Sequence, residues 1–205
     1  MTRKNDVQVI DLSSPYGEQA MTLRKRYWVD EYRWKESDGS HYETDEFDPQ
    51  SGHFGYVEDG HLVGYCRFIP NEGTLPLVKV FPSVQQVLDD KGAVCGEYSR
   101  LILDPAYRGK DLSLSFFRAV FHWAYPRQLT CWLFEVEQWM IDLFRSLYFS
   151  IEVLDQPVFY KGANGHPDQW TFPVLLDVMQ SLSSLESGDQ NLYHFFVDAL
   201  PIRSA

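Results

Sequence analysis

Charged residues interrupt apolar, strand-like segments at two places in this sequence. Arg67 stands inside LVGYCRFI, and Glu97, Ser99 and Arg100 lie within the alternating segment 94–103. A charge in a strand that packs against a core is costly unless a partner neutralises it. These side chains are therefore either a buried structural network of arginine and carboxylate groups or part of a site for a polar ligand.

A second group of polar and aromatic residues precedes them. The segment 41–51 is expected to be an acidic loop, and its carboxylates include Glu43, Asp45 and Asp48. The helix expected before it carries one arginine and two tryptophans near helical spacing, Arg24, Trp28 and Trp34. Each has an ordinary structural interpretation, since tryptophans commonly belong to a core and aspartate before proline commonly forms a turn. The charges of this loop and of the two strand-like segments nevertheless follow the first helix along the chain in an order that allows all of them to line a single pocket beside it.

No metal or nucleotide motif accompanies these residues. The six histidines and three cysteines show no ligand spacing, and the sequence has no G-x-S-x-G, P-loop or G-x-G-x-x-G motif. Cys66, Cys95 and Cys131 lie far apart in apolar segments, which is typical of buried, reduced thiols. We therefore expect no metal and no cofactor.

The elements that position these residues alternate along the chain. Helices are predicted at 16–34, 83–90, 112–123, 137–148 and 178–200, the last interrupted at Ser187-Gly188, and strands at 53–58, 61–69, 94–103, 129–136, 151–160 and 170–176. Asp59-Gly60 predicts a hairpin between the first two strands. This order predicts a mixed α/β fold in which helices flank one central sheet, with a single domain over 1–205.

Composition and charge exclude several classes of partner. The chain has 205 residues, of which 44% are hydrophobic, and a formal net charge of −11, so its field repels nucleic acid. No segment approaches the ~20 apolar residues of a membrane span. We therefore expect a cytoplasmic protein without a nucleic-acid partner.

Taken together, these residues resemble the signature of the LuxI-type acyl-homoserine-lactone synthases, the bacterial autoinducer synthases. The matching motifs are Arg24, Trp28, Trp34, Glu43-x-Asp45-x-x-Asp48, Gly64-x-x-Arg67, Lys79-x-Phe81-Pro82, Glu97-x-Ser99-Arg100 and Val136-Glu137. The resemblance implies a GNAT-like fold with a V-shaped cleft. It also implies a quorum-sensing acyltransferase that acylates the amine of S-adenosyl-L-methionine, a substrate, and then closes a lactone with release of methylthioadenosine.

The resemblance implies a role for each site residue. S-adenosylmethionine would be bound by Arg24, Trp28, Trp34, Glu43, Asp45, Asp48 and Arg67. Glu97, Ser99 and Arg100 would form the catalytic group, with Glu97 as the base and Ser99 orienting its neighbours. Backbone N–H groups at 101–104 would stabilise the oxyanion. Glu135 and Glu137 are interpreted only as charges at the start of a helix.

Two further expectations concern the acyl donor. Trp132 and Leu133 stand on a strand where many family members have a small hydroxyl residue, so we expect them to limit the acyl pocket and to favour an unsubstituted chain over a 3-oxo chain. Four basic residues, Arg108, Lys110, Arg118 and Arg145, are expected to dock an acidic acyl carrier protein as the donor. The sequence Arg108-Gly109-Lys110 lacks a second glycine, which argues against acyl-CoA.

Two alternatives stay open. An N-acyl amino acid synthase, or another GNAT-type N-acyltransferase, would acylate an amine without closing a lactone, and release of methylthioadenosine separates it from the first interpretation. A catalytically inactive acyl-binding or signalling module would bind S-adenosylmethionine without turnover. Intact Arg24, Arg67, Glu97 and Arg100 argue against this second alternative.

Overall fold

A mixed sheet of eight strands forms the centre of the computed structural model, which describes residues 6–33, 35–108, 112–164 and 166–198. The strands are β1 Gln8–Val9, β2 Gly52–Glu58, β3 His61–Pro70, β4 Cys95–Leu103, β5 Cys131–Glu137, β6 Ile151–Val153, β7 Val158–Tyr160 and β8 Gln169–Asp177. They are arranged in the order β1-β2-β3-β4-β5-β8-β6, and β7 pairs with β8. β4 and β5 are parallel, whereas the other neighbouring strands are antiparallel. The predicted mixed α/β architecture is confirmed.

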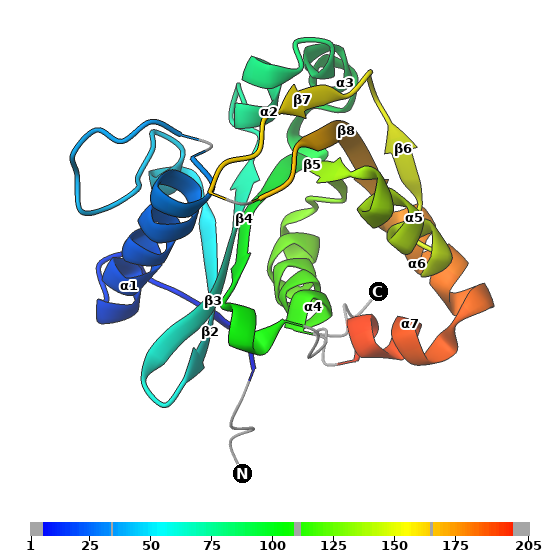
Figure 1. Ribbon diagram of the computed structural model, residues 1–205. Helices are drawn as coiled ribbons and strands as arrows, with labels where there is room; N and C mark the ends of the chain where they lie inside the picture. The colour runs from blue at the N-terminus through cyan, green and yellow to red at the C-terminus, as the bar shows by residue number, and fades with distance from the viewer. Residues whose placement is uncertain (1–5, 34, 109–111, 165, 199–205) are drawn as a thin grey trace.

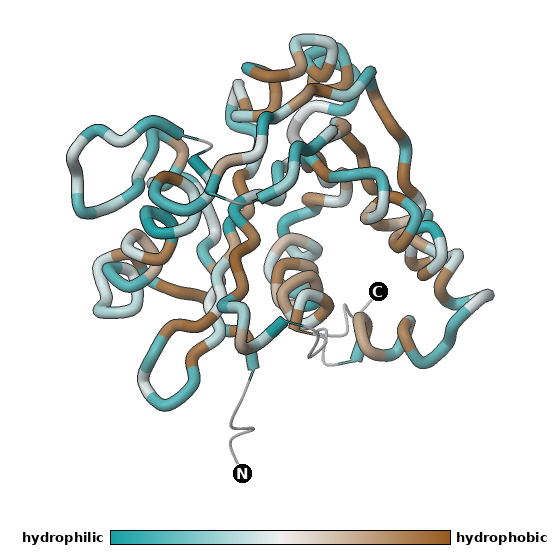
Figure 2. Tube along the Cα trace, viewed as in Figure 1, coloured by the Kyte–Doolittle hydropathy of each residue, from teal (hydrophilic) through white to brown (hydrophobic). Residues whose placement is uncertain are grey.

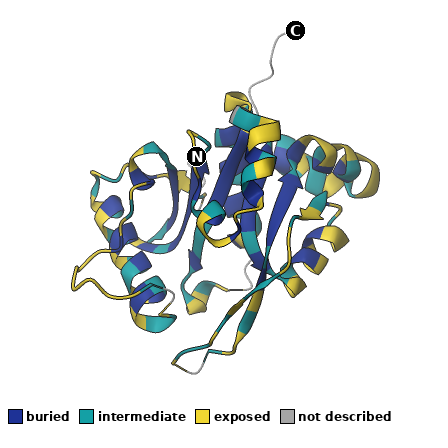
Figure 3. Cartoon of the chain, turned by 90° about the horizontal axis from the view of Figure 1, so that it is seen from above, coloured by how far each residue is buried: buried dark blue, intermediate teal, exposed yellow. Residues whose placement is uncertain are grey.

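Helices cover both faces of this sheet (Figure 1). They are α1 Pro15–Arg24, α2 Pro76–Val80, α3 Val84–Lys91, α4 Leu112–Ala124, α5 Gln138–Ser146, α6 Val178–Gly188 and α7 Gln190–Val197. Adjacent residues of β3 serve opposite faces, since Tyr65 packs with Met21 of α1 while Cys66 packs in the core beneath α4. Figure 2 shows hydrophobic residues along the central strands and α4, and Figure 3 shows the same strands buried between exposed outer helix faces.

Two of the elements predicted from the sequence, one helix and one strand, are wrong in their extent. The helix expected at 16–34 ends at Arg24 and continues as a π-helix over Lys25–Glu31. Contacts made by Arg24 and Trp28 with distant segments override the local helical period, and such widened turns are frequent at functional sites. The strand expected at 151–160 is divided into β6 and β7, because Pro157 has no N–H group for a ladder bond. The expected break in the last helix, at Ser187-Gly188, is confirmed within one residue.

The feature that creates a site is the separation of β4 from β5. The two strands pair only from Cys95–Cys131 to Glu97–Leu133, and beyond that point they diverge. β4 also carries a bulge, where the register with β3 shifts and Arg100 has a φ of 58°. The result is the V-shaped opening that the sequence resemblance implied.

Candidate active site

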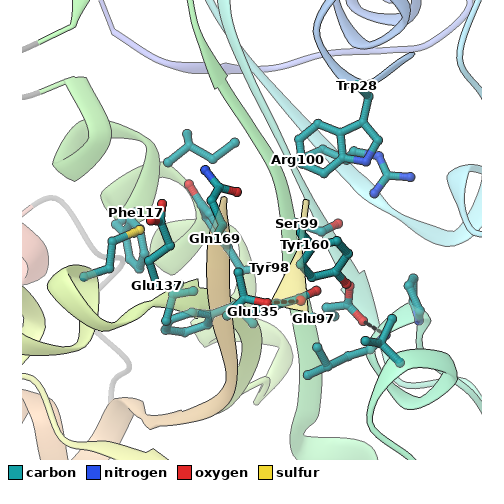
Figure 4. Close-up of a pocket in the computed structure, with 18 residues that line it drawn as sticks. Trp28, Glu97, Tyr98, Ser99, Arg100, Phe117, Glu135, Glu137, Tyr160 and Gln169 are labelled. Carbon is teal, nitrogen blue, oxygen red and sulfur yellow. Dashed lines mark hydrogen bonds between the residues drawn. The ribbon is translucent and has the colours of Figure 1, made fainter. Parts of the chain in front are cut away.

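A cavity of about 420 Å³ fills the opening between β4 and β5 (Figure 4). Because paired residues share a face and side chains alternate along a strand, Glu97 lies on the same face as Leu133 and Glu135, and Phe134 lies on the other. The part of the cavity on the first face contains the polar residues Glu97, Glu135, Glu137, Tyr160, Gln169 and Thr171, together with the apolar residues Pro76, Leu77 and Val80 of α2. The other part is mainly apolar: Tyr98, Phe117, Phe134, Val136 and Met140. The cavity thus joins a polar chamber to an apolar one through the sheet.

Glu97 is the most buried carboxyl group of the cavity, with 6% of the residue exposed. Its Oε2 atom accepts a hydrogen bond of 2.7 Å from the backbone N–H of Leu77, at the start of α2. Burial raises the pKa of Glu97 to about 7; the Leu77 N–H and the positive charges of Arg67 and Arg100 oppose this shift, and the charge of Glu135 adds to it. A carboxyl group with a pKa near neutrality is suited to accept and return a proton.

Glu135 is a second cavity carboxyl, which the sequence interpretation assigned only to the start of a helix. It accepts a hydrogen bond of 2.5 Å from the hydroxyl of Thr171 on β8 and another from Tyr160 on β7. Burial raises the pKa of Glu135 above its ordinary value. The signal that identifies it is the one used for Arg67, namely a charged residue inside an apolar strand, here in WLFEVE.

Three arginines and three carboxylates form an arginine–carboxylate network beside the polar chamber. Its members are Arg24, Glu43, Asp45, Asp48, Arg67 and Arg100. Oδ1 of Asp48 accepts hydrogen bonds of 2.6 Å from both Arg24 and Arg67. Arg100 reaches Glu43 at 3.1 Å and Asp45 at 3.3 Å. The predicted group is thus confirmed as a cluster, and its charges already neutralise one another.

The electrostatics of this network follow from its pairing. Burial opposes ionisation of Glu43, but the guanidinium groups of Arg100 and Arg24 more than offset it and lower the pKa of that carboxyl. Burial likewise opposes ionisation of Asp48, and its pKa is lowered chiefly by Arg24. Both groups therefore remain ionised at neutral pH, which keeps the arginines paired.

Arg100 and Trp28 connect the network to the cavity. The guanidinium of Arg100 lies 4.7 Å from the ring centroid of Trp28, and both residues line the cavity. In Figure 4 they stand on one side of it, with Phe117 on the opposite side. Ser99 accepts a hydrogen bond of 3.3 Å from Nε of Arg67, an orienting contact rather than that of an activated nucleophile.

The two residues expected to wall the acyl pocket do not line the cavity. Trp132 is in the core, where its ring packs against Tyr98 and Phe117, and Leu133 is fully buried on the opposite face of the sheet. Both precede the point where β5 leaves β4, so the cavity wall is built from the next residues, Phe134 to Glu137. Trp132 therefore supports the wall from behind.

The remaining expected residues are dispersed. Trp34 and Lys110 fall outside the residues that the structure describes. Arg108 donates a hydrogen bond to Tyr32, and Arg118 packs on Phe195 of α7. Arg145 is exposed on α5. The expected docking residues thus lie on separate elements.

The described residues contain no cluster of His, Cys, Asp or Glu that could hold a metal ion. In the same part of the chain, no helix is long and apolar enough to cross a membrane.

Comparison with known proteins identifies the family. A family model described as N-acyl amino acid synthase FeeM matches residues 19–167. The chain belongs to the FeeM family. An acyl-homoserine-lactone synthase from Vibrio anguillarum is 30% identical over 124 residues, which make up 55% of this chain and 63% of the relative. The matched region therefore spans less than two thirds of that relative's length.

Solved structures of FeeM-family and related proteins share the fold. The CoA-dependent acyl-homoserine lactone synthase BjaI, solved with SAM and isopentyl-CoA, superposes with a TM-score of 0.70 at 20% identity, over 89% of this chain and 88% of BjaI. FeeM itself, from uncultured soil microbes, has a TM-score of 0.64 at 16% identity, over 88% and 94% of the two chains. These likenesses confirm the GNAT-like fold and the resemblance to acyl-homoserine-lactone synthases expected from the motifs.

Proposed function

We propose that this chain is an acyl-homoserine-lactone synthase, which transfers an acyl group from a thioester to the amine of S-adenosyl-L-methionine and releases methylthioadenosine. The observation that carries the proposal is the cavity through the sheet, which joins an apolar chamber to a polar chamber containing Glu97. An acyl chain fits the apolar side, and a cationic amino acid derivative fits the carboxyl-rich side. The identity to the Vibrio anguillarum synthase supports the same reaction.

The acceptor would bind beside the arginine–carboxylate network. Trp28 lines the cavity and would pack on the adenosyl or sulfonium portion, since aromatic faces attract cations. Arg100 is the network arginine that lines the cavity, so it is the group placed to bind the substrate carboxylate through paired N–H bonds. Asp45 and Asp48 would act by holding the arginines rather than by touching the sulfonium.

The first chemical step requires a neutral amine. Glu97 would take one proton from the substrate ammonium group, and the freed lone pair would attack the thioester carbonyl carbon. The negative charge on oxygen would be stabilised by backbone N–H groups of β4 that face the opening rather than a strand. The sequence interpretation placed these donors at 101–104, but the N–H of Asp104 is bonded to Val63 O at 2.9 Å, so we assign them to the cavity-lining part, residues 97–101. Collapse then breaks the carbon–sulfur bond; the departing sulfur takes up the second proton of the amine nitrogen and leaves as a thiol, a neutral amide remains, and Glu97 releases its proton to solvent.

The second step closes the ring. The substrate carboxylate attacks the carbon next to the sulfonium sulfur, a carbon–oxygen bond forms, and the carbon–sulfur electron pair leaves with neutral methylthioadenosine. Because the sulfonium is already a good leaving group, the protein needs mainly to hold the chain in a folded conformation.

We propose an acyl carrier protein as the donor, with an unsubstituted acyl chain. Phe117, Phe134, Val136 and Met140 in the apolar chamber offer no hydroxyl to a 3-oxo group, and the hydroxyl of Tyr98, the fifth residue named there, is buried beside the Cys66 thiol. Burying a ketone without a partner costs about 1–3 kcal/mol. Arg108 and Arg145 are both exposed, so an acidic carrier could reach their charges, although Arg108 also donates a hydrogen bond to Tyr32. Because BjaI is CoA-dependent, acyl-CoA is the alternative donor that should be tested beside the acyl carrier protein.

A direct assay tests the proposal. Purified protein is incubated with S-adenosylmethionine and either acyl-carrier-protein or acyl-CoA thioesters of several chain lengths, and products are measured by mass spectrometry. We expect an acyl-homoserine lactone and equimolar methylthioadenosine, formed faster from the carrier thioester. An N-acyl amino acid without methylthioadenosine would instead establish the alternative function, which the FeeM-family match favours.

A further inference from the structure

Three carboxyl groups line the cavity, Glu97, Glu135 and Glu137, and burial raises the pKa of two of them, Glu97 and Glu135. Among the described residues no lysine or arginine forms an ion pair with either of these two. The carboxylates of the arginine–carboxylate network, in contrast, are all bound to arginines. An unpaired carboxylate in a partly closed chamber is costly, and a bound cation removes that cost.

Glu135 is held in one orientation but is not saturated. The hydroxyl groups of Thr171 and Tyr160 donate hydrogen bonds to it from two other strands, β8 and β7. A carboxylate has about four acceptor positions, so roughly two remain for a ligand. A carboxylate fixed by its neighbours loses little rotamer freedom when it binds a ligand.

The position of Glu135 relative to Glu97 is set by strand register. Leu133 is the partner of Glu97 across the β4–β5 pair, and Glu135 is the next residue of β5 on the same face. The strands diverge between these positions, so the two carboxyl groups face the same chamber from its two sides (Figure 4). The charge of Glu135 also acts on Glu97, as expected for neighbours in a poorly solvated space.

We propose that Glu135 binds the ammonium group of the acceptor substrate, opposite Glu97. An ammonium group carries three donors, so it can contact both carboxylates at once before one proton passes to Glu97. Glu135 thereby selects a primary amine on an amino acid derivative. This inference rests on the proposed acyltransfer to an amine and adds the residue that orients it.

The test is Glu135→Gln, with binding measured by calorimetry. The amide oxygen still accepts from Thr171 and its NH₂ group can donate to the Tyr160 oxygen, so the chamber keeps its shape. The ligands are S-adenosylmethionine and S-adenosylhomocysteine, which share the ammonium and differ in the sulfonium charge. We expect about tenfold weaker binding of both, the usual scale for one hydrogen bond to a charged group. The exposed residue Glu152 on β6 gives the control, Glu152→Gln, which should bind like the wild type.

Each outcome decides the inference. Unchanged affinity of Glu135→Gln for both ligands overturns it, and a loss confined to S-adenosylmethionine also overturns it, because Glu135 would then face the sulfonium. Failure of the wild type to bind either ligand refutes the proposed function instead. In that case the same variant is compared on L-methionine and its 2-hydroxy analogue, where a tenfold loss for the amine alone is expected. A wild type that binds none of these ligands overturns both proposals.

Discussion

Replacing Glu97 by glutamine removes the proposed base while keeping its shape. The glutamine carbonyl can still accept the hydrogen bond that Leu77 N–H makes at 2.7 Å, so the start of α2 keeps its contact. A positioned acid or base contributes about 10²–10⁴-fold to a rate, and we expect kcat to fall by at least about 100-fold. The remaining activity comes from binding and orientation of the two substrates.

The pH dependence of this variant provides the sharper test. Burial raises the pKa of Glu97 to about 7, so in the wild type kcat/KM should increase with pH until about 7 as the base ionises. A second increase of kcat/KM with pH, near the ordinary α-amino pKa of about 8, should arise from deprotonation of the substrate amine. In the Glu97→Gln variant, the increase of kcat/KM that Glu97 causes should be absent, and the increase that the substrate amine causes should remain.

At a pH above about 7, the Glu97→Gln variant should be more stable to unfolding than the wild type, although its turnover is lower. A carboxyl whose pKa is higher in the folded state binds more protons when folded, so the wild type loses stability as the pH rises from about 4.5 to about 7. The shift corresponds to roughly 3–4 kcal/mol at most. At pH 8 the glutamine variant should therefore melt above the wild type, and at pH 4 no such gain is expected. A variant with more than a third of wild-type turnover, or with an unaltered pH–rate profile, would refute the assignment of Glu97 as base.

Three further predictions concern the network and the acyl chamber. Asp48→Asn weakens the 2.6 Å contacts to two buried arginines and should lower the free energy of unfolding by about 3–5 kcal/mol. The melting temperature should fall and activity should be lost, and an unchanged melting curve would contradict this. Ser99→Ala removes only an acceptor for Arg67 and should reduce turnover less than about tenfold, whereas a trapped acyl-serine in wild-type protein would show direct participation. Trp132→Leu should move the product distribution to longer acyl chains, because the indole supports the cavity wall. Leu133→Ala, on the other face of the sheet, should leave the distribution unchanged. A Trp132→Leu variant with the chain-length profile of the wild type would argue against this arrangement.

The order of elements and the charged cluster could be predicted from the sequence because both depend on local rules. Alternation, helical period and the Asp59-Gly60 turn define most strands and helices within a few residues of their observed ends. Arg67 could be assigned to a cluster because a charge inside an apolar strand requires partners wherever the strand lies. The identity of those partners came from the structure, which pairs Arg67 with Asp45 and Asp48.

What faces the cavity was decided by the tertiary structure alone. Alternation states which residues of a strand share a face, but not where two parallel strands separate, and β5 leaves β4 just after Leu133. That point places Trp132 behind the wall and Glu135 in the chamber, whereas the family resemblance puts Trp132 in the acyl pocket and the sequence pattern puts Glu135 at a helix start. The hydroxyl groups that orient Glu135 come from β7 and β8, more than twenty residues later. Such contacts depend on long-range strand pairing, which no local period encodes.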